Sequence, residues 1–159
     1  SGIPFVYVGW AVVAAIVTGT LFFLVSSKAL SHVKWLKPIL SLILLSTVLR
    51  WFCCAFVQSP FLFVVLHGLH GITFGLFHAW VVFQFARLFP PDLRQTAQGW
   101  LIGAGYGLGG AMGMGVGGFI IETTTVQNAW FAMAGFALIA LVAGTVFSLL
   151  EEQPKHGRA

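Results

Sequence analysis

The chain holds five apolar stretches, each long enough to cross a membrane. A transmembrane helix needs about 20 mostly apolar residues, because the hydrocarbon core is about 30 Å thick and a helix rises about 1.5 Å per residue. Apolar and polar residues do not alternate within the stretches, which excludes barrel strands. The sequence therefore predicts an all-α integral membrane bundle. Its spans 1 to 5 are predicted at residues 4–26, 38–57, 60–87, 96–121 and 127–150, with a short tail at 151–159.

Charged side chains are too few for a soluble protein. Only 8% of the 159 residues are charged, and 58% are hydrophobic, whereas a soluble domain carries about 25% charged residues. The expected surroundings of the chain are therefore membrane lipid. The formal net charge of +4 is too small for a surface that follows nucleic-acid phosphates, so no nucleic-acid partner is expected.

The basic residues predict how the chain is oriented. Seven of the eight lie in the first loop, in or beside the third loop, or in the tail, and the second and fourth loops hold none. By the positive-inside rule, the first and third loops and the C-terminus are cytoplasmic, which places the N-terminus outside. Because span 1 has no basic leader before it, we expect the chain to be a piece of a longer protein. A complete five-span protein with a processed end is the alternative. The seven residues are Lys28, Lys34, Lys37, Arg87, Arg94, Lys155 and Arg158.

Arg50 is the eighth basic residue, and it lies inside span 2. A charge inside the hydrocarbon is costly, and such residues usually face a bundle interior or a pathway. Arg50 is therefore predicted to attract an anionic group of a solute or to take part in a charge relay. The alternative is that its long side chain reaches outward to the headgroups.

Three histidines lie along span 3. On a regular helix His67 and His78 fall within about 20° of each other, with Gly71 and Phe74 on the same face and His70 about 60° to the side. This arc is typical of a polar stripe along a pathway, although buried structural histidines are an alternative. No carboxylate or thiolate joins the histidines at ligand spacing, and all lie on one helix, so neither a metal nor a haem is expected. No cofactor and no enzymatic activity are predicted.

Span 4 is rich in glycine. Gly105, Gly109, Gly113 and Gly117 recur at four-residue steps, which is typical of small-xxx-small packing between membrane helices. Glycine also weakens a helix and permits bending. The spacing therefore predicts a helix that packs closely, bends, or does both.

Several segments together resemble the C-terminal half of a major facilitator superfamily transporter. The most specific is LHGITFGLFH at 69–78, and the resemblance extends over essentially the whole chain. It is similar to the 3-phenylpropionate permease branch and, more distantly, to lactose-permease-like proton symporters. The other segments are Gly9-Trp10 with the apolar run to Phe22-Phe23, Arg50-Trp51, PPDLRQTAQG at 90–99, and the glycine-rich span.

The resemblance implies that the five spans correspond to helices 8–12 of a twelve-helix fold. It implies a secondary transporter of the bacterial inner membrane that moves a small organic solute, such as an aromatic acid or a sugar-like compound, by alternating access and proton symport. The expected partners are the missing N-terminal half or other membrane subunits. The pathway residues are expected to be Arg50, His67, His70, Phe74 and His78, with Trp51 and Gln84 as weaker candidates, while Arg94 and Gln98 brace the cytoplasmic loop.

The sequence departs from this family pattern at two acidic positions. Gly19 stands near the place of an expected glutamate, and Thr73 stands where a carboxylate follows the histidine in the lactose-permease branch. Because no span interior holds Asp or Glu, coupling through carboxylates would need groups outside this chain, or the histidines would act alone. A non-transporting structural subunit of a larger complex is the alternative function.

Overall fold

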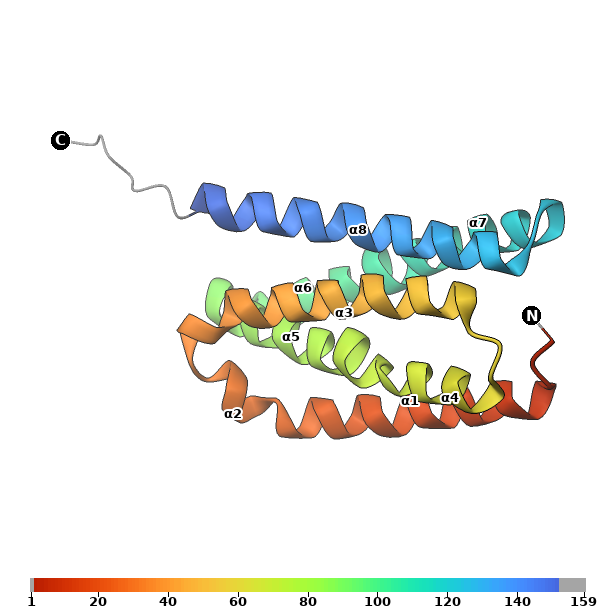
Figure 1. The fold of residues 1–159 in the computed structure, drawn as a ribbon. Coiled ribbons are helices and arrows are strands. Elements are labelled where there is room, and N and C mark those ends of the chain that lie inside the picture. Colours follow the sequence, from red (N-terminus) through yellow and green to blue (C-terminus); the bar gives the residue numbers. More distant parts are fainter. Residues whose placement is uncertain (1, 152–159) are drawn as a thin grey trace.

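The computed structural model describes residues 2–151, which form a bundle of long helices (Figure 1). Five helical spans are long and apolar enough to cross a membrane. Most of the tail predicted at 151–159 lies outside the described residues. The structure places span 1 at Phe5–Val25, span 2 at Val33–Phe56, span 3 at Pro60–Leu88, span 4 at Arg94–Thr123 and span 5 at Val126–Val146.

Three of the spans are built from more than one helical segment. Span 1 is the single helix α1 (Phe5–Val25), and span 5 lies within α8 (Val126–Glu151). After the short helix α2 (Ser27–Leu30), span 2 joins the 3₁₀ turn η1 (Val33–Trp35) to α3 (Leu36–Phe56). Span 3 comprises α4 (Pro60–Gly68), the π-helical segment η2 (Gly71–Leu76) and α5 (Phe77–Leu88). Span 4 comprises α6 (Arg94–Trp100), the π-helical segment η3 (Leu101–Leu108) and α7 (Gly109–Thr123).

Local chemistry explains where the spans begin and end. At the start of α4, the Ser59 hydroxyl accepts a hydrogen bond from the backbone N–H of Leu62 at 3.4 Å, and Pro60 occupies the first turn, where a missing N–H costs nothing. Helix α5 ends at Leu88, and Phe89 is extended, because the residue before a proline avoids the helical region.

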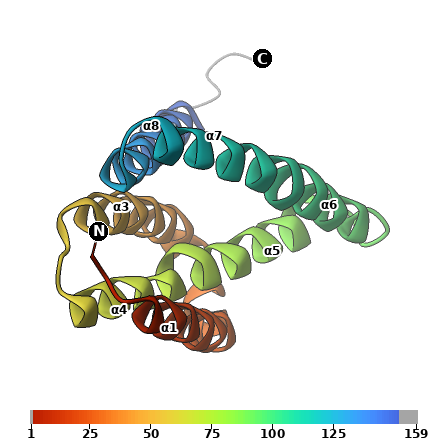
Figure 2. The same cartoon turned by 90° about the vertical axis from the view of Figure 1, so that its right-hand side faces the viewer.

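Four of the spans pack side by side in a closed ring when the bundle is viewed from its end (Figure 2). Helix α3 packs along α8, α7 packs on α8, α6 contacts α5, and α3 also contacts span 3. Spans 2 to 5 therefore form a ring, and α1 lies against α4 and η2 on its outer side. Span 4 runs obliquely in Figure 2, from α6 beside α5 to α7 beside α8.

The surface of the bundle is apolar and its core is small. Most of the buried apolar side chains are small, and several are alanines. Large apolar side chains face outward, among them Phe5, 89% exposed, and Met114, 76% exposed. Such a surface is unfavourable in water but suits lipid, whose tails are as apolar as leucine. The five long apolar helices confirm an integral membrane protein.

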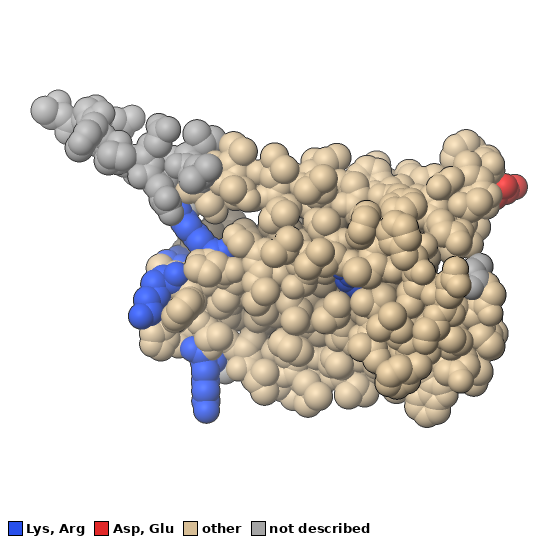
Figure 3. Space-filling view, in the orientation of Figure 1, with Lys and Arg blue, Asp and Glu red and all other residues tan. Residues whose placement is uncertain are grey.

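Charged side chains gather at the two ends of the bundle. On the face drawn in Figure 3, Lys and Arg surround the end where α2 lies, and an acidic side chain lies at the opposite end. The lateral surface between the ends is almost entirely uncharged on this face. This distribution matches a protein whose waist lies in hydrocarbon and whose ends reach water.

The four regularly spaced glycines of span 4 make no close backbone approach to another span within the described residues. A Cβ added at Gly105 or Gly109 would meet only atoms of span 4, at 3.4 and 3.6 Å, and at Gly113 it would meet nothing within 4 Å. At Gly117 it would reach Met133 Cε at 3.6 Å, which is ordinary contact. Within the described residues, these four glycines therefore do not make the predicted close packing against another span. Packing against another membrane partner stays a prediction.

The close helix approach lies instead between α1 and η2. A Cβ added at Gly71 would lie 2.7 Å from the Thr18 carbonyl oxygen and 2.6 Å from Phe22 Cδ2. At Gly75 an added Cβ would collide with the backbone of Gly19. Only glycine at these two positions lets the backbones of spans 1 and 3 touch, so this crossing fixes where α1 lies against span 3.

Candidate functional site

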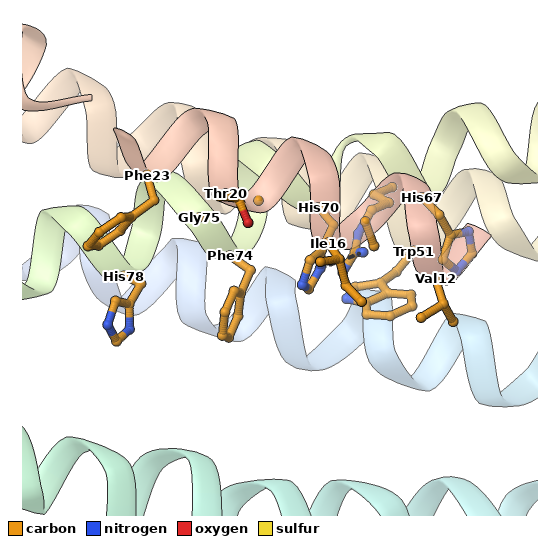
Figure 4. A pocket seen from close by; sticks show the side chains of 13 residues that line it. Val12, Ile16, Thr20, Phe23, Trp51, His67, His70, Phe74, Gly75 and His78 are labelled. Atoms are coloured by element: carbon orange, nitrogen blue, oxygen red, sulfur yellow. Dashed lines mark hydrogen bonds between the residues drawn. The ribbon is translucent and has the colours of Figure 1, made fainter. Parts of the chain in front are cut away.

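A cavity of about 700 Å³ lies where α1, α3 and span 3 meet (Figure 4). Its volume is within the range of about 300–1,000 Å³ that small-molecule sites occupy. The walls are mostly apolar, with Arg50 and three imidazoles as the main polar groups. Such a combination of apolar walls and a few convergent polar groups is typical of a ligand site. The lining residues are Val12, Ala15, Ile16, Gly19, Thr20, Phe23, Arg50, Trp51, His67, His70, Phe74, Gly75 and His78.

Arg50 is buried at the wall of this cavity. Its side chain is only 5% exposed, so the alternative that it reaches outward to the headgroups does not fit the structure. Its Nη1 donates to His70 Nδ1 at 3.3 Å, and its Cζ lies 4.0 Å from the centre of the Trp51 ring. Its buried Nε–H has no hydrogen-bond partner among the described residues. A buried cation with a free donor can bind an anionic group.

No acidic side chain compensates Arg50 within the described part of the spans. Asp92 lies in the third loop, and Glu122 lies in the last turn of α7; both are exposed. The guanidinium instead contacts a neutral ring nitrogen of His70 and the indole face of Trp51. A cation over an indole is attracted to the ring quadrupole, but that attraction leaves the formal positive charge in place.

The hydrogen bonds assign the protons of two imidazoles. A guanidinium can only donate, so His70 Nδ1 accepts from Arg50 and the ring proton of His70 sits on Nε2. A carbonyl can only accept, so His67 Nδ1 donates to the Phe63 oxygen at 2.9 Å. The neutral His67 ring then keeps its Nε2 lone pair. His70 thus keeps a hydrogen-bond donor at Nε2, and His67 keeps an acceptor at Nε2.

Stacked rings continue from Arg50 along span 3. His70 stacks on Phe74 with centroids 4.9 Å apart and planes 8° from parallel, and Phe74 lies 6.2 Å from His78 at 19°. His78 Nδ1 is hydrogen-bonded to the Tyr106 hydroxyl at 2.9 Å. The row therefore runs from the buried cation to η3, and the Tyr106 hydroxyl joins the middle of span 4 to span 3.

The π-helical segment η2 changes which faces of span 3 meet the cavity. The regular-helix expectation placed Gly71 on the face of His67 and His78, but Gly71 is buried against α1. Gly75 lines the cavity instead. The prediction that Gly71 shares the face of His67 and His78 is therefore wrong. The π-helical turns begin at Gly71 and rotate the residues after it relative to a regular helix. The three histidines and Phe74 still line one cavity.

The remaining predicted residues lie outside the cavity. Gln84 is half-buried on α5, and its Oε1 accepts from Arg87 Nη1 at 3.1 Å. Arg94 Nε donates to the Phe89 carbonyl at 3.1 Å, just beyond the end of α5. Gln98 is half-buried on α6. Of these, Arg94 contacts a carbonyl at a helix end, the kind of contact expected for a loop brace.

Sequence reasoning did not single out several residues that the structure brings to the site. Trp130 of α8 stacks on Trp51, with centroids 5.3 Å apart and an interplanar angle of 17°. Tyr106 bonds His78, and Phe23 of α1 lines the cavity 5.7 Å from the His78 ring. The chain has 16 Phe, 6 Trp and 2 Tyr, so an aromatic residue in a span carries no signal by its type alone.

No metal cluster supplements these side chains. Among residues 2–151, no group of three or more His, Cys, Asp or Glu could hold a metal ion. Cys54 is buried and Cys53 is exposed, and both are free thiols. The chemistry of the site is therefore that of one cation, three imidazoles and aromatic faces.

Comparison with known proteins shows which family carries this architecture. The MFS_1 like family matches residues 4–133, which is most of the chain and includes every residue that lines the cavity. No curated protein and no solved structure matches the chain. The family match, the five apolar helices and the cavity between them agree with one another. The chain belongs to the MFS_1 like family of membrane transporters.

Proposed function

We propose that this chain is part of a secondary transporter that carries a small organic anion across a membrane by alternating access. One observation carries the proposal: Arg50 is a buried cation at the wall of an apolar cavity, with an unpartnered Nε–H. A buried charge without a counter-ion is costly. An anionic solute bound at Arg50 would supply the missing charge.

The walls of the cavity favour an aromatic acid over a sugar-like solute. Phe23, Trp51 and Phe74 offer ring surfaces to a flat apolar body. Thr20 supplies the only hydroxyl among the lining residues. A sugar carries many hydroxyl groups, and each that is buried needs a partner. A ring that bears one carboxylate matches the single cation and the apolar walls.

The rest of the transporter would complete the site. We propose that spans 1 to 5 correspond to helices 8–12 of a twelve-helix protein, with a missing N-terminal half or another membrane subunit opposite the cavity. The resemblance of LHGITFGLFH at 69–78 to the 3-phenylpropionate permease branch supports this assignment. The basic end of the bundle in Figure 3 supports a cytoplasmic position for that end. We propose a bacterial inner membrane, as the family resemblance implies.

Proton coupling, if carried by this chain, would rest on imidazoles rather than carboxylates. His67, His70 and His78 line the cavity, whereas the described acidic side chains lie at the ends of the spans. Histidine is the side chain whose ordinary pKa is closest to neutral pH. Symport would therefore be abolished by replacing the three histidines together, while exchange of solute across the membrane would persist.

Uptake by proteoliposomes containing the full-length protein tests the proposal. The probe is benzenesulfonate, an aromatic anion that stays ionised and therefore does not leak as a neutral acid. Arg50→Gln is expected to lower the apparent affinity at least about 30-fold, because truncating one partner of a buried charge pair costs about 2–5 kcal/mol. Arg87→Gln is the control, since Arg87 is exposed at the end of α5.

Two outcomes would contradict the proposal. Equal uptake by wild type and Arg50→Gln would remove Arg50 from solute binding. No uptake by the wild-type protein, together with a stable stoichiometric complex with other membrane proteins, would support the structural-subunit alternative. The absence of acidic groups inside the described spans is the observation that favours that alternative.

A further inference from the structure

Trp130 lies behind the cavity wall and does not line the cavity. It belongs to α8, and its ring stacks on Trp51 of α3 at 5.3 Å and 17°. Trp51 does line the cavity, and the centre of its ring lies 4.0 Å from Arg50 Cζ. The Trp51 ring therefore lies between α8 and the buried cation: Trp130 of α8 stacks on it, and Arg50 lies over it.

The Trp51 ring is one surface against which the guanidinium rests, with Arg50 Cζ 4.0 Å from the ring centre. The Arg50 guanidinium also donates to His70 Nδ1, at the rather long distance of 3.3 Å. No acidic side chain in the described spans pairs with Arg50. Cation–π attraction depends on the cation lying over the ring face. The position of the Arg50 donors therefore depends on the orientation of the Trp51 ring.

Neighbouring rings hold Trp51 in that orientation. The Trp130 ring lies nearly parallel to the Trp51 ring, while the His67 ring meets Trp130 edge-on at 6.4 Å and 76°. His67 is itself fixed by its hydrogen bond to the Phe63 carbonyl at 2.9 Å. Side chains of α3, α4 and α8 thus form one aromatic cluster behind Arg50, and Trp130 is the part that α8 contributes.

We infer that Trp130 is a positioning residue for the anion site: it holds the Trp51 ring, and through that ring it sets the direction in which Arg50 presents its donors. The inference rests on the proposed function, because it assigns Trp130 a role in recognising the charge of the solute. Trp130 touches no solute itself. Its loss should weaken the binding of an anion much more than the binding of a neutral molecule of the same shape.

A binding experiment on the full-length protein in detergent separates this role from ordinary packing. Benzoate and benzamide have nearly the same shape and differ in charge, so the ratio of their affinities reports the contribution of Arg50. Trp130→Leu and Trp130→Met both remove the indole face, and the second preserves more of its volume. Each is expected to lower the affinity for benzoate about tenfold and leave that for benzamide within about twofold. Trp130→Phe, which restores a ring face, is expected to keep most of the ratio.

Phe131→Leu is the matched control. Phe131 follows Trp130 on α8 and packs on Phe52 and Phe56 of α3, with ring centroids 6.0 and 5.4 Å apart. Replacing it therefore weakens the same pair of helices away from Arg50. The benzoate-to-benzamide ratio is expected to stay at the wild-type value in this variant, even if the melting temperature falls.

The outcomes distinguish the inference from the function on which it rests. A wild-type protein that binds benzoate no better than benzamide contradicts the proposed function. A wild-type preference for benzoate that survives in a folded Trp130→Leu or Trp130→Met variant overturns the role of Trp130 alone. An equal loss of both affinities also overturns it, because this is the result of a structural defect. Should both aliphatic variants fail to fold, Trp130→Tyr is compared with Trp130→Gln, which has no ring. An unchanged ratio in Trp130→Tyr with a reduced ratio in Trp130→Gln decides in favour of a ring-face requirement, and equal ratios in these two variants decide against it.

Discussion

Arg50 and His70 fix each other's chemistry within the cavity wall. Because a guanidinium has no acceptor, the 3.3 Å contact requires a lone pair on His70 Nδ1 and therefore a neutral ring whose proton lies on Nε2. A second proton on His70 would place two cations side by side and remove the acceptor. Binding of an anion at Arg50, as proposed, would thus be linked to protonation of His70 through one hydrogen bond.

Replacing His70 tests this link. His70→Leu leaves Arg50 without its nitrogen acceptor, so the guanidinium is expected to lose its position. We expect the affinity for benzoate to fall about tenfold, because losing a buried hydrogen-bond partner costs about 1–3 kcal/mol. His70→Asn places a side-chain oxygen near the former Nδ1 position and should restore part of the affinity. Calorimetric titration of the purified protein measures both. Equal affinities in His70→Leu and wild type would show that the contact is not used.

Arg50 and the histidines could be predicted from the sequence, whereas their aromatic neighbours could not. A charged or imidazole side chain in an apolar span is expensive in lipid, so its presence alone indicates an interior position. Trp130 and Tyr106 are compatible with lipid, packing or a site, and their types do not distinguish these surroundings. Their roles depend on which span lies beside which, and that comes only from the tertiary structure.

Span 3 shows how a local change of helix type repositions functional residues. Regular periodicity predicts one face for Gly71 and the histidines, but Gly71 is buried against α1. Within the π-helical segment that begins there, Gly75 both contacts α1 and lines the cavity. The two glycines that contact span 1, Gly71 and Gly75, therefore both lie in the π-helical segment η2. The repeated glycines of span 4, with a clearer sequence pattern, make no such approach within the described residues.

The crossing of α1 and η2 is expected to tolerate no added carbon. Gly75→Ala would force a Cβ into the Gly19 backbone, so we expect a loss of stability of about 1–3 kcal/mol, typical of overpacking, and a smaller cavity. Gly113→Ala is the matched control, because a Cβ there meets nothing within 4 Å and alanine favours a helix. Thermal melting in detergent should show a fall for the first variant and no fall for the second. The reverse order would contradict the described crossing.

At the scale of the whole molecule, the bundle is organised for lipid rather than for a deep core. Large apolar side chains cover its outside, charges gather at its ends, and its main cavity is lined from three spans. The number of spans could be predicted because length and hydropathy suffice for that. The ring of spans 2 to 5 could not, because every helix is apolar on nearly all sides and no face reveals its neighbour.

The charge at the ends predicts the orientation in the membrane. In a variant with Cys53→Ala and Cys54→Ala, we expect Gln58→Cys in the second loop to react with a membrane-impermeant maleimide added to intact cells. Ser31→Cys in the first loop is expected to react only after the membrane is opened. Both residues are exposed, so access is decided by the side of the membrane. Labelling in the opposite order would contradict the positive-inside assignment.

The central claim, that Arg50 receives the negative charge of a solute in this cavity, is tested most directly by locating a bound anion. A crystal structure of the full-length protein with 4-iodobenzoate shows the ring by the anomalous signal of iodine. We expect iodine within the cavity between α1, α3 and span 3, with a carboxylate oxygen about 2.7–2.9 Å from an Arg50 donor. Iodobenzoate bound elsewhere, or bound in the cavity with its carboxylate directed away from Arg50, would contradict it.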